Sequence, residues 1–222
     1  MDLPRWLKGR ATERDLRLVA DAIGRAEARS SGEIVPMVVR SSSPVGHAGL
    51  LTFALLSLAL WTLAPLVRLG LRALVSVDVR RWTLELGALG LAAGLTAVFS
   101  RHDGWLRWLI SPRDRTTNVG RRALHEFHAS RINEASAHTG VLLFVSLLER
   151  RAVVLADWAI AERIPQAAWQ DVVDLLLKGL RERDLSAGYV AAIERAGDHL
   201  AEHFPAERSA RRELPNELVI RD

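Results

Sequence analysis

The residues of this chain best suited to chemistry are carboxylates that follow an apolar run in the second half of the sequence. Asp157 comes directly after the run 151–156, and Glu162, Asp171 and Asp174 follow it. Several carboxylates that converge beside an open position hold a divalent cation such as calcium or magnesium and assist hydrolysis. Asp157 is therefore the candidate metal ligand. Asp171 and Asp174 lie on an expected helix whose other face is apolar, so a solvated surface explains them.

Other catalytic patterns are missing from the sequence. His125 and His128 are three residues apart, which does not match the HExxH spacing of zinc protease helices, so we interpret them as surface histidines. The 222 residues contain no cysteine, no glycine-rich phosphate loop and no GxSxG elbow. The net charge is only +4, and no basic stripe with interleaved aromatic residues is present. We therefore expect no nucleic-acid partner.

The apolar residues are concentrated in the middle of the chain. Ala48 to Val67 contains no charged residue, and at about 1.5 Å per residue it crosses a hydrocarbon core of roughly 30 Å. A weaker second segment, Trp82 to Ser100, contains one acid, Glu85. We expect Glu85 to pair with Arg81, one turn away, at the membrane interface. Residues 48–100 are thus interpreted as a transmembrane hairpin with spans at about 48–67 and 82–100.

Two features of the hairpin predict how it packs and which way it is inserted. Gly90 and Gly94 form a GxxxG motif that allows close helix approach, and we favour packing on the first span over a dimerisation motif. A homo-oligomer stays open as an alternative. Arginines are more numerous on the two outer flanks of the hairpin than in its connecting loop. This bias favours a multi-pass protein of the cell (inner) membrane with both termini in the cytoplasm.

The segments on either side of the hairpin carry complementary parts of one domain. Residues 1–47 predict a helix that begins after Thr12 and a strand at 33–40, which Pro36 places at a sheet edge or a bulge. Residues 101–205 predict strands at 141–147 and 151–156, and helices at 117–137, after Ile164-Pro165 and at 186–203. Neither part can bury a core alone, so we expect a joint α/β domain with a three- to four-stranded sheet. Residues 206–222 are interpreted as a charged, disordered tail.

Three arginines are expected at one end of this sheet. If the first two strands are parallel, their carboxyl ends share one edge, where open α/β sheets usually bind ligands. Arg40 follows the first strand, and Arg150 and Arg151 form the turn after the second. Because the first strand leads directly into the membrane segment, we expect these three arginines to contact anionic lipid headgroups or a partner protein.

The motifs assembled so far resemble the TPM domain family. The matching residues are Ser31 to Val35, Thr139 to Leu143, Glu149 to Val153, and Ile164-Pro165. The resemblance implies an α/β/α sandwich, an accessory role for larger membrane complexes and, for some members, a proposed phosphatase activity. Residues 157–162 replace a Gly- and Tyr-containing loop that many relatives have at this point, which weakens any transfer of catalytic residues.

Taken together, the sequence favours a non-enzymatic function. We expect a membrane-tethered α/β module without a cofactor that binds or helps to assemble another membrane protein, while the lipid bilayer surrounds the hairpin. The alternative is a divalent-metal-dependent phosphatase of TPM type that uses Asp157.

Overall fold

The chain forms two compact units. The computed structural model describes residues 3–43, 46–75, 81–99, 111–130, 139–206 and 215–221. One unit, the α/β unit, consists of Met1–Ser43 together with Pro112–Asp222. The other, the helical unit, is Pro44–Ser111. The α/β unit is therefore discontinuous in sequence, because the helical unit interrupts it.

A four-stranded sheet in the order β3-β2-β1-β4 forms the centre of the α/β unit. The strands are β1 (Glu33–Val39), β2 (Gly140–Ser146), β3 (Arg151–Ala156) and β4 (Val219–Arg221). β1 runs parallel to both β2 and β4, and β3 is antiparallel to β2. The α/β class and the hairpin between the second and third strands are thus confirmed. The first two strands are parallel, which is the condition on which the expected arginine edge depends. All seven residues of β1 and of β2 are buried, as their continuous apolar sequences require.

Pro36 lies in an inner strand, so its predicted position at an edge or bulge is wrong. The N–H of Glu33 and the C=O of Val39 bond toward the β2 side. Because successive backbone groups of a strand point to alternate sides, the nitrogen of Pro36 faces the other side of β1. There the short strand β4 pairs only with Met37–Val39. Proline is tolerated because no ladder bond is required from it.

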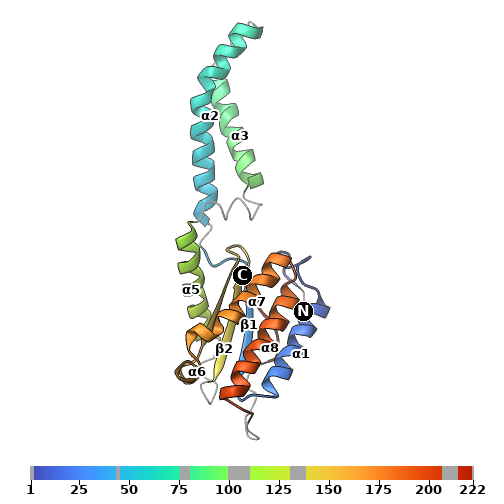
Figure 1. Ribbon diagram of the computed structural model, residues 1–222. Coiled ribbons are helices and arrows are strands. Elements are labelled where there is room, and N and C mark those ends of the chain that lie inside the picture. The colour runs from blue at the N-terminus through green and yellow to red at the C-terminus, as the bar shows by residue number, and fades with distance from the viewer. Residues whose placement is uncertain are drawn as a thin grey trace. The chain divides into compact units, whose positions relative to one another are not determined.

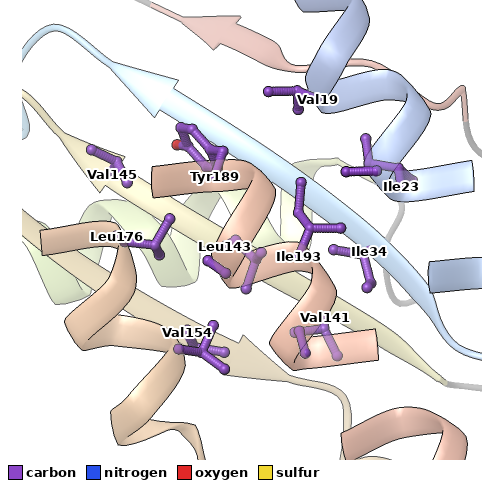
Figure 2. Close-up of a cluster of buried hydrophobic side chains, with 14 of the residues drawn as sticks. Val19, Ile23, Ile34, Val141, Leu143, Val145, Val154, Leu176, Tyr189 and Ile193 are labelled. Atoms are coloured by element: carbon purple, nitrogen blue, oxygen red, sulfur yellow. The ribbon is translucent and has the colours of Figure 1, made fainter. Parts of the chain in front are cut away.

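Helices cover both faces of the sheet (Figure 1). On one face lie α1 (Glu13–Glu27), α7 (Gln170–Glu182) and α8 (Leu185–His203), with α8 packed against both of the others. The cluster beneath them includes Ile34, Leu143 and Val154 from the strands. Figure 2 shows these side chains meeting Ile23, Leu176 and Ile193 from the three helices. Tyr189 is fully buried there, and its hydroxyl donates to the Met37 carbonyl at 2.6 Å.

The other face is covered by α5 (Pro112–Ala129), whose Val119, Ala123 and Phe127 contact Met37 and Phe144. The sequence pattern predicts a helix at 117–137, but α5 begins five residues earlier. Pro112 takes the first helical position, where its missing N–H and fixed φ cost nothing. Residues 131–137 of the predicted helix lie outside the described part of the chain.

Two further elements differ from the sequence-based expectation. The short helix α6 (Trp158–Arg163) and the 3₁₀ turn η2 (Gln166–Trp169) precede α7, so Ile164-Pro165 separates two helices and opens only the second. Residues 219–221, expected in a disordered tail, instead form β4 beside β1. Leu218 is buried in the core, and this apolar stretch explains why the segment attaches.

The helical unit contains α2 (Gly46–Val75) and α3 (Arg81–Phe99), which pack against each other (Figure 1). In α2, Leu50–Gly70 is long and apolar enough to cross a membrane, and only 6% of this window is buried inside the protein. The apolar part of α3, Thr83–Phe99, is shorter and does not reach the same length. One helix therefore passes the criteria for a span, where the sequence predicts two.

The GxxxG motif of α3 does not pack on α2 as expected. A Cβ atom added to Gly90 or Gly94 would meet no atom within 4 Å. Ala92, which is fully buried, lies on a different face of the helix. The helix pair is thus formed by another face of α3, and the two glycines stay exposed.

A glycine contact between α7 and α8 is expected to limit the stability of the α/β unit. A Cβ on Gly179 would lie 2.6 Å from the Cα of Gly188 and 2.7 Å from the Asp184 carbonyl oxygen. Gly179→Ala should therefore force the helices apart and lower the free energy of unfolding by about 1–3 kcal/mol. Thermal unfolding of the full-length protein in mild detergent measures this change.

Gly120→Ala is the matched control for that substitution. Gly120 lies inside α5, where an added Cβ meets nothing within 4 Å. The higher helix propensity of alanine should raise stability by up to about 1 kcal/mol. If both variants shift the unfolding temperature in the same direction, the close contact at Gly179 does not limit packing.

Candidate functional site

The carboxyl ends of β1 and β2 form one edge of the sheet, and three arginines gather at it. In the register of the sheet, Val39 is paired with Ser146, which is paired with Arg151. Arg40 follows Val39 directly, and its carbonyl accepts from the N–H of Leu148 at 3.0 Å. Arg150 occupies the turn between β2 and β3 with a left-handed φ of 51°. Arg40, Arg150 and Arg151 are all exposed, so the structure brings the three sequence-predicted residues together on an accessible edge.

At the same edge a buried carboxylate organises the segment that leaves β1. Glu149 is only 3% exposed. Its Oε1 accepts from the N–H of Ser43 at 2.9 Å and from the hydroxyl of Ser41 at 3.2 Å. Its Oε2 accepts from the Ser146 hydroxyl at 2.5 Å, and the N–H of Ser42 reaches both oxygens at 3.2 Å. This arrangement, the Glu149 clamp, consists of Glu149, Ser41, Ser42, Ser43 and Ser146.

Two additional contacts extend the Glu149 clamp. The hydroxyl of Ser42 bonds that of Ser146 at 2.9 Å, and the side-chain amide of Asn118 in α5 donates to the Ser43 hydroxyl at 3.2 Å. The clamp thereby ties the residues after β1 to β2, to the following turn and to α5. Only Pro44 and Val45 separate Ser43 from the start of α2. The clamp therefore fixes the point at which the chain leaves the sheet for the helical unit.

The hydrogen bonds of the clamp determine the charge state of Glu149. Burial desolvates the carboxylate and would raise its pKa, but the bonds from Ser146, Ser43 and Ser42 outweigh this effect and lower the pKa below the usual value of a glutamate. Glu149 is consequently an anion at neutral pH. In the sequence analysis Glu149 appears only as the first residue of the motif 149–153 that resembles the TPM domain family. The sequence contained one indication of this role of Glu149. A glutamate follows the apolar strand β2, and three consecutive serines follow β1.

Asp157, the candidate metal ligand, lies at the opposite end of the sheet from the Glu149 clamp. Its N–H donates to the carbonyl of Gly140, the first residue of β2. Its side chain is 7% exposed and caps α6, with Oδ1 accepting from the N–H of Trp158 at 2.7 Å. Within the described ranges, no three His, Asp or Glu side chains come close enough to hold a metal ion together. The contact that the structure gives the Asp157 side chain is therefore the cap of α6.

The other carboxylates considered with Asp157 have separate environments. Asp171 at the start of α7 forms an ion pair with Arg195, and its oxygens lie 3.3 Å from Nε2 of His199. Burial would raise the pKa of Asp171, but the bonds from Arg195 and His199 lower it. Asp174 accepts from the side chain of Gln170 at 3.0 Å. Asp171 thus connects α7 to α8, and Asp174 makes a contact within α7. Both contacts lie at the surface of the helices, as a solvated helix face implies.

Comparisons with known proteins agree with this architecture. Residues 91–199 match the family model of the TPM domain. The NMR structure of the BA42 protein from the psychrophilic bacterium Bizionia argentinensis is similar, with a TM-score of 0.57, 19% sequence identity and coverage of 94% of both chains. This likeness concerns the fold. The search of curated proteins found no match.

The matched range covers only part of the α/β unit. It begins within α3 and ends within α8, so it includes β2 and β3 but not α1 or β1. Nevertheless β1 is an inner strand of the same sheet. The domain is therefore completed by residues that lie before the helical unit in the sequence.

Replacement of Glu149 tests the clamp. Glu149→Gln keeps the size of the side chain but puts an NH₂ group among donors from Ser42, Ser43 and Ser146. The loss of charged hydrogen bonds at a buried site should lower the free energy of unfolding at pH 7 by about 1–3 kcal/mol. Denaturant unfolding of the full-length protein in detergent measures the difference, with the exposed Glu162→Gln as control.

The same pair of proteins should differ in pH dependence. Because the pKa of Glu149 is lower in the folded state, the carboxylate adds stability above the usual glutamate pKa. This contribution disappears as the pH falls through the lower, folded-state value. The gap between wild type and Glu149→Gln should thus narrow on acidification. A gap that is constant from neutral to acidic pH contradicts the assignment.

Proposed function

We propose that this TPM-domain protein is an accessory factor anchored in the cell membrane, whose α/β unit binds another membrane protein at the sheet edge that carries Arg40, Arg150 and Arg151. The observation that carries the proposal is the exposed apolar surface of α2. Leu50–Gly70 buries almost none of its length within the protein. Such a surface requires a cover, and a bilayer supplies it.

The energy involved is large compared with the stability of a domain. Nine leucine, valine and tryptophan side chains of α2 are between 46% and 69% exposed: Leu50, Leu51, Leu55, Leu58, Trp61, Leu63, Leu66, Val67 and Leu69. Full burial of such a side chain contributes about 1.5–3 kcal/mol, so roughly half of that is available for each. Transfer into lipid would then gain on the order of 10 kcal/mol, which strongly favours insertion.

The discontinuous domain supports a second crossing by α3. β1 precedes the helical unit and β2 follows it, yet they are paired along their whole length. Both must therefore lie on one side of the bilayer, which requires an even number of crossings. The 19 residues of α3 extend over about 28 Å, close to the roughly 30 Å of a hydrocarbon core. We infer a two-span hairpin with both termini in the cytoplasm.

The anchor also explains the choice of the arginine edge as binding surface. The Glu149 clamp fixes Ser43, and the short connection to Gly46 tethers this edge to an inserted α2. Arg40, Arg150 and Arg151 would then be held near anionic headgroups and the cytoplasmic parts of neighbouring membrane proteins. Asp157 caps a helix at the other end, so the arrangement of described side chains favours binding over metal-dependent phosphate hydrolysis.

Topology can be tested without background labelling because the chain contains no cysteine. We expect Ser76→Cys, in the segment between α2 and α3, to react with a membrane-impermeant maleimide in intact cells. Glu182→Cys at the end of α7 should react only after the membrane is disrupted. Labelling of both variants from the same side would contradict the two-span arrangement, and release of the protein by alkaline carbonate would contradict insertion.

The binding role is tested by affinity purification of the full-length protein in mild detergent. We expect a stoichiometric membrane-protein partner whose recovery falls at least fivefold in the double variant Arg150→Glu with Arg151→Glu. The control is Arg181→Glu, an exposed position on α7. No partner, combined with metal-dependent phosphate release that Asp157→Asn abolishes, would replace this proposal with the phosphatase alternative.

A further inference from the structure

A cavity between α2 and α3 combines apolar walls with two opposite charges. It has a volume of about 410 Å³, and Trp61, Pro65 and Arg68 of α2 line it together with Leu84 and Glu85 of α3. A neighbouring hollow shares Trp61 and Glu85 with it. A volume in this range is typical of sites for small molecules. The cavity lies wholly within the helical unit.

Arg68 and Glu85 are the ionisable side chains described in these two helices, and both line this cavity. Each is half-buried. Charged side chains are rare in apolar membrane helices because hydrocarbon solvates them poorly, and they generally mark functional sites. The expectation that Glu85 serves only to pair with Arg81 is therefore incomplete, since its side chain also lines the cavity with Arg68.

The position of the cavity along the helices matches the depth of lipid headgroups. Arg68 is near the end of the apolar window Leu50–Gly70, and Glu85 is near the start of Thr83–Phe99. The ends of membrane-crossing segments lie at the interface between hydrocarbon and water. This step rests on the proposed insertion of the helical unit.

The chemistry of the lining selects a zwitterionic ligand. A guanidinium group binds phosphate through two parallel hydrogen bonds, and a carboxylate binds a primary ammonium group. An arginine has five donors and a carboxylate about four acceptor positions, so both groups can bind a ligand while keeping partners within the protein. Pro65 adds a polar site, because it has no N–H to donate to the carbonyl of Trp61.

We propose that the cavity between α2 and α3 binds the headgroup of a phospholipid with a primary amine, the phosphate at Arg68 and the ammonium at Glu85. Phosphatidylethanolamine has this chemistry. Its acyl chains would continue along the leucines exposed on α2. A phosphatidylglycerol headgroup offers the phosphate but only neutral hydroxyl donors, and no cation, for Glu85. A quaternary choline offers no N–H donor. The site therefore discriminates between lipids by the amine.

The test uses the full-length protein in detergent, with native mass spectrometry after addition of phosphatidylethanolamine, phosphatidylglycerol or phosphatidylcholine. Wild type should prefer phosphatidylethanolamine over phosphatidylglycerol by about tenfold, as one charge-assisted hydrogen-bonded contact implies. Glu85→Gln should abolish this preference while retaining phospholipid. Arg68→Gln should lose bound phospholipid of both kinds, and Arg68→Lys should restore part of it.

Three controls separate the outcomes. Thr96→Val, in α3 outside the cavity lining, should keep the wild-type preference, and its folding is checked with the others by helix content and monodispersity. Soluble phosphoethanolamine should not displace the lipid at equal concentration; if it does, a free metabolite rather than a lipid is the ligand and the proposal is overturned.

An unchanged lipid preference in Glu85→Gln, or a dimer without bound lipid, also overturns the proposal. Release by carbonate would refute the anchor itself, whereas an anchored protein without lipid preference refutes only this site.

Discussion

The constraint on which this structure depends is that β1 must pair with strands encoded after the helical unit. Seven consecutive residues, Glu33 to Val39, are buried and joined to β2 in parallel register. A buried strand without its ladder would leave a row of unpaired backbone groups, each costly to remove from water. The two halves of the domain are therefore not independent. Any path that the chain takes through residues 44–111 has to bring β2 back beside β1.

The Glu149 clamp holds the ends of β1 and β2 together at one edge of the sheet. A carboxylate from the turn after β2 accepts from N–H and hydroxyl donors in the segment after β1, and also from the nearby Ser146 of β2. The charge is therefore stabilised mainly by groups far away in sequence. Most of these donors are backbone or serine groups, which hold the anion without a counter-charge. The arginines beside it are left on the surface. The edge thus combines a buried anion, held by hydrogen bonds, with exposed arginines.

Sequence patterns identified the elements whose signal is local. The continuous apolar runs of β1 and β2 predicted buried strands, and the polar turn predicted the antiparallel β3. Pro36 led to the wrong prediction of an edge strand. A proline is tolerated in the inner strand β1 because β4 is too short to pair with it, and no local sequence pattern encodes the length of β4. The role of Glu149 depends on Ser41 to Ser43, more than 100 positions earlier in the chain. The sequence also did not predict that Gly90 and Gly94 lie on an exposed face of α3. A GxxxG motif allows close helix approach but does not specify which helix packs on it.

The distance between paired strands has a consequence for synthesis of the protein. Glu33 pairs with Gly140, so the partner of β1 leaves the ribosome 107 residues later, about 5–20 s at ordinary elongation rates. α2 and α3 are therefore translated before the first strand has its neighbour β2. During this interval β1 is an apolar extended segment in need of protection, and early commitment of α2 to the bilayer would keep it from meeting other nascent chains.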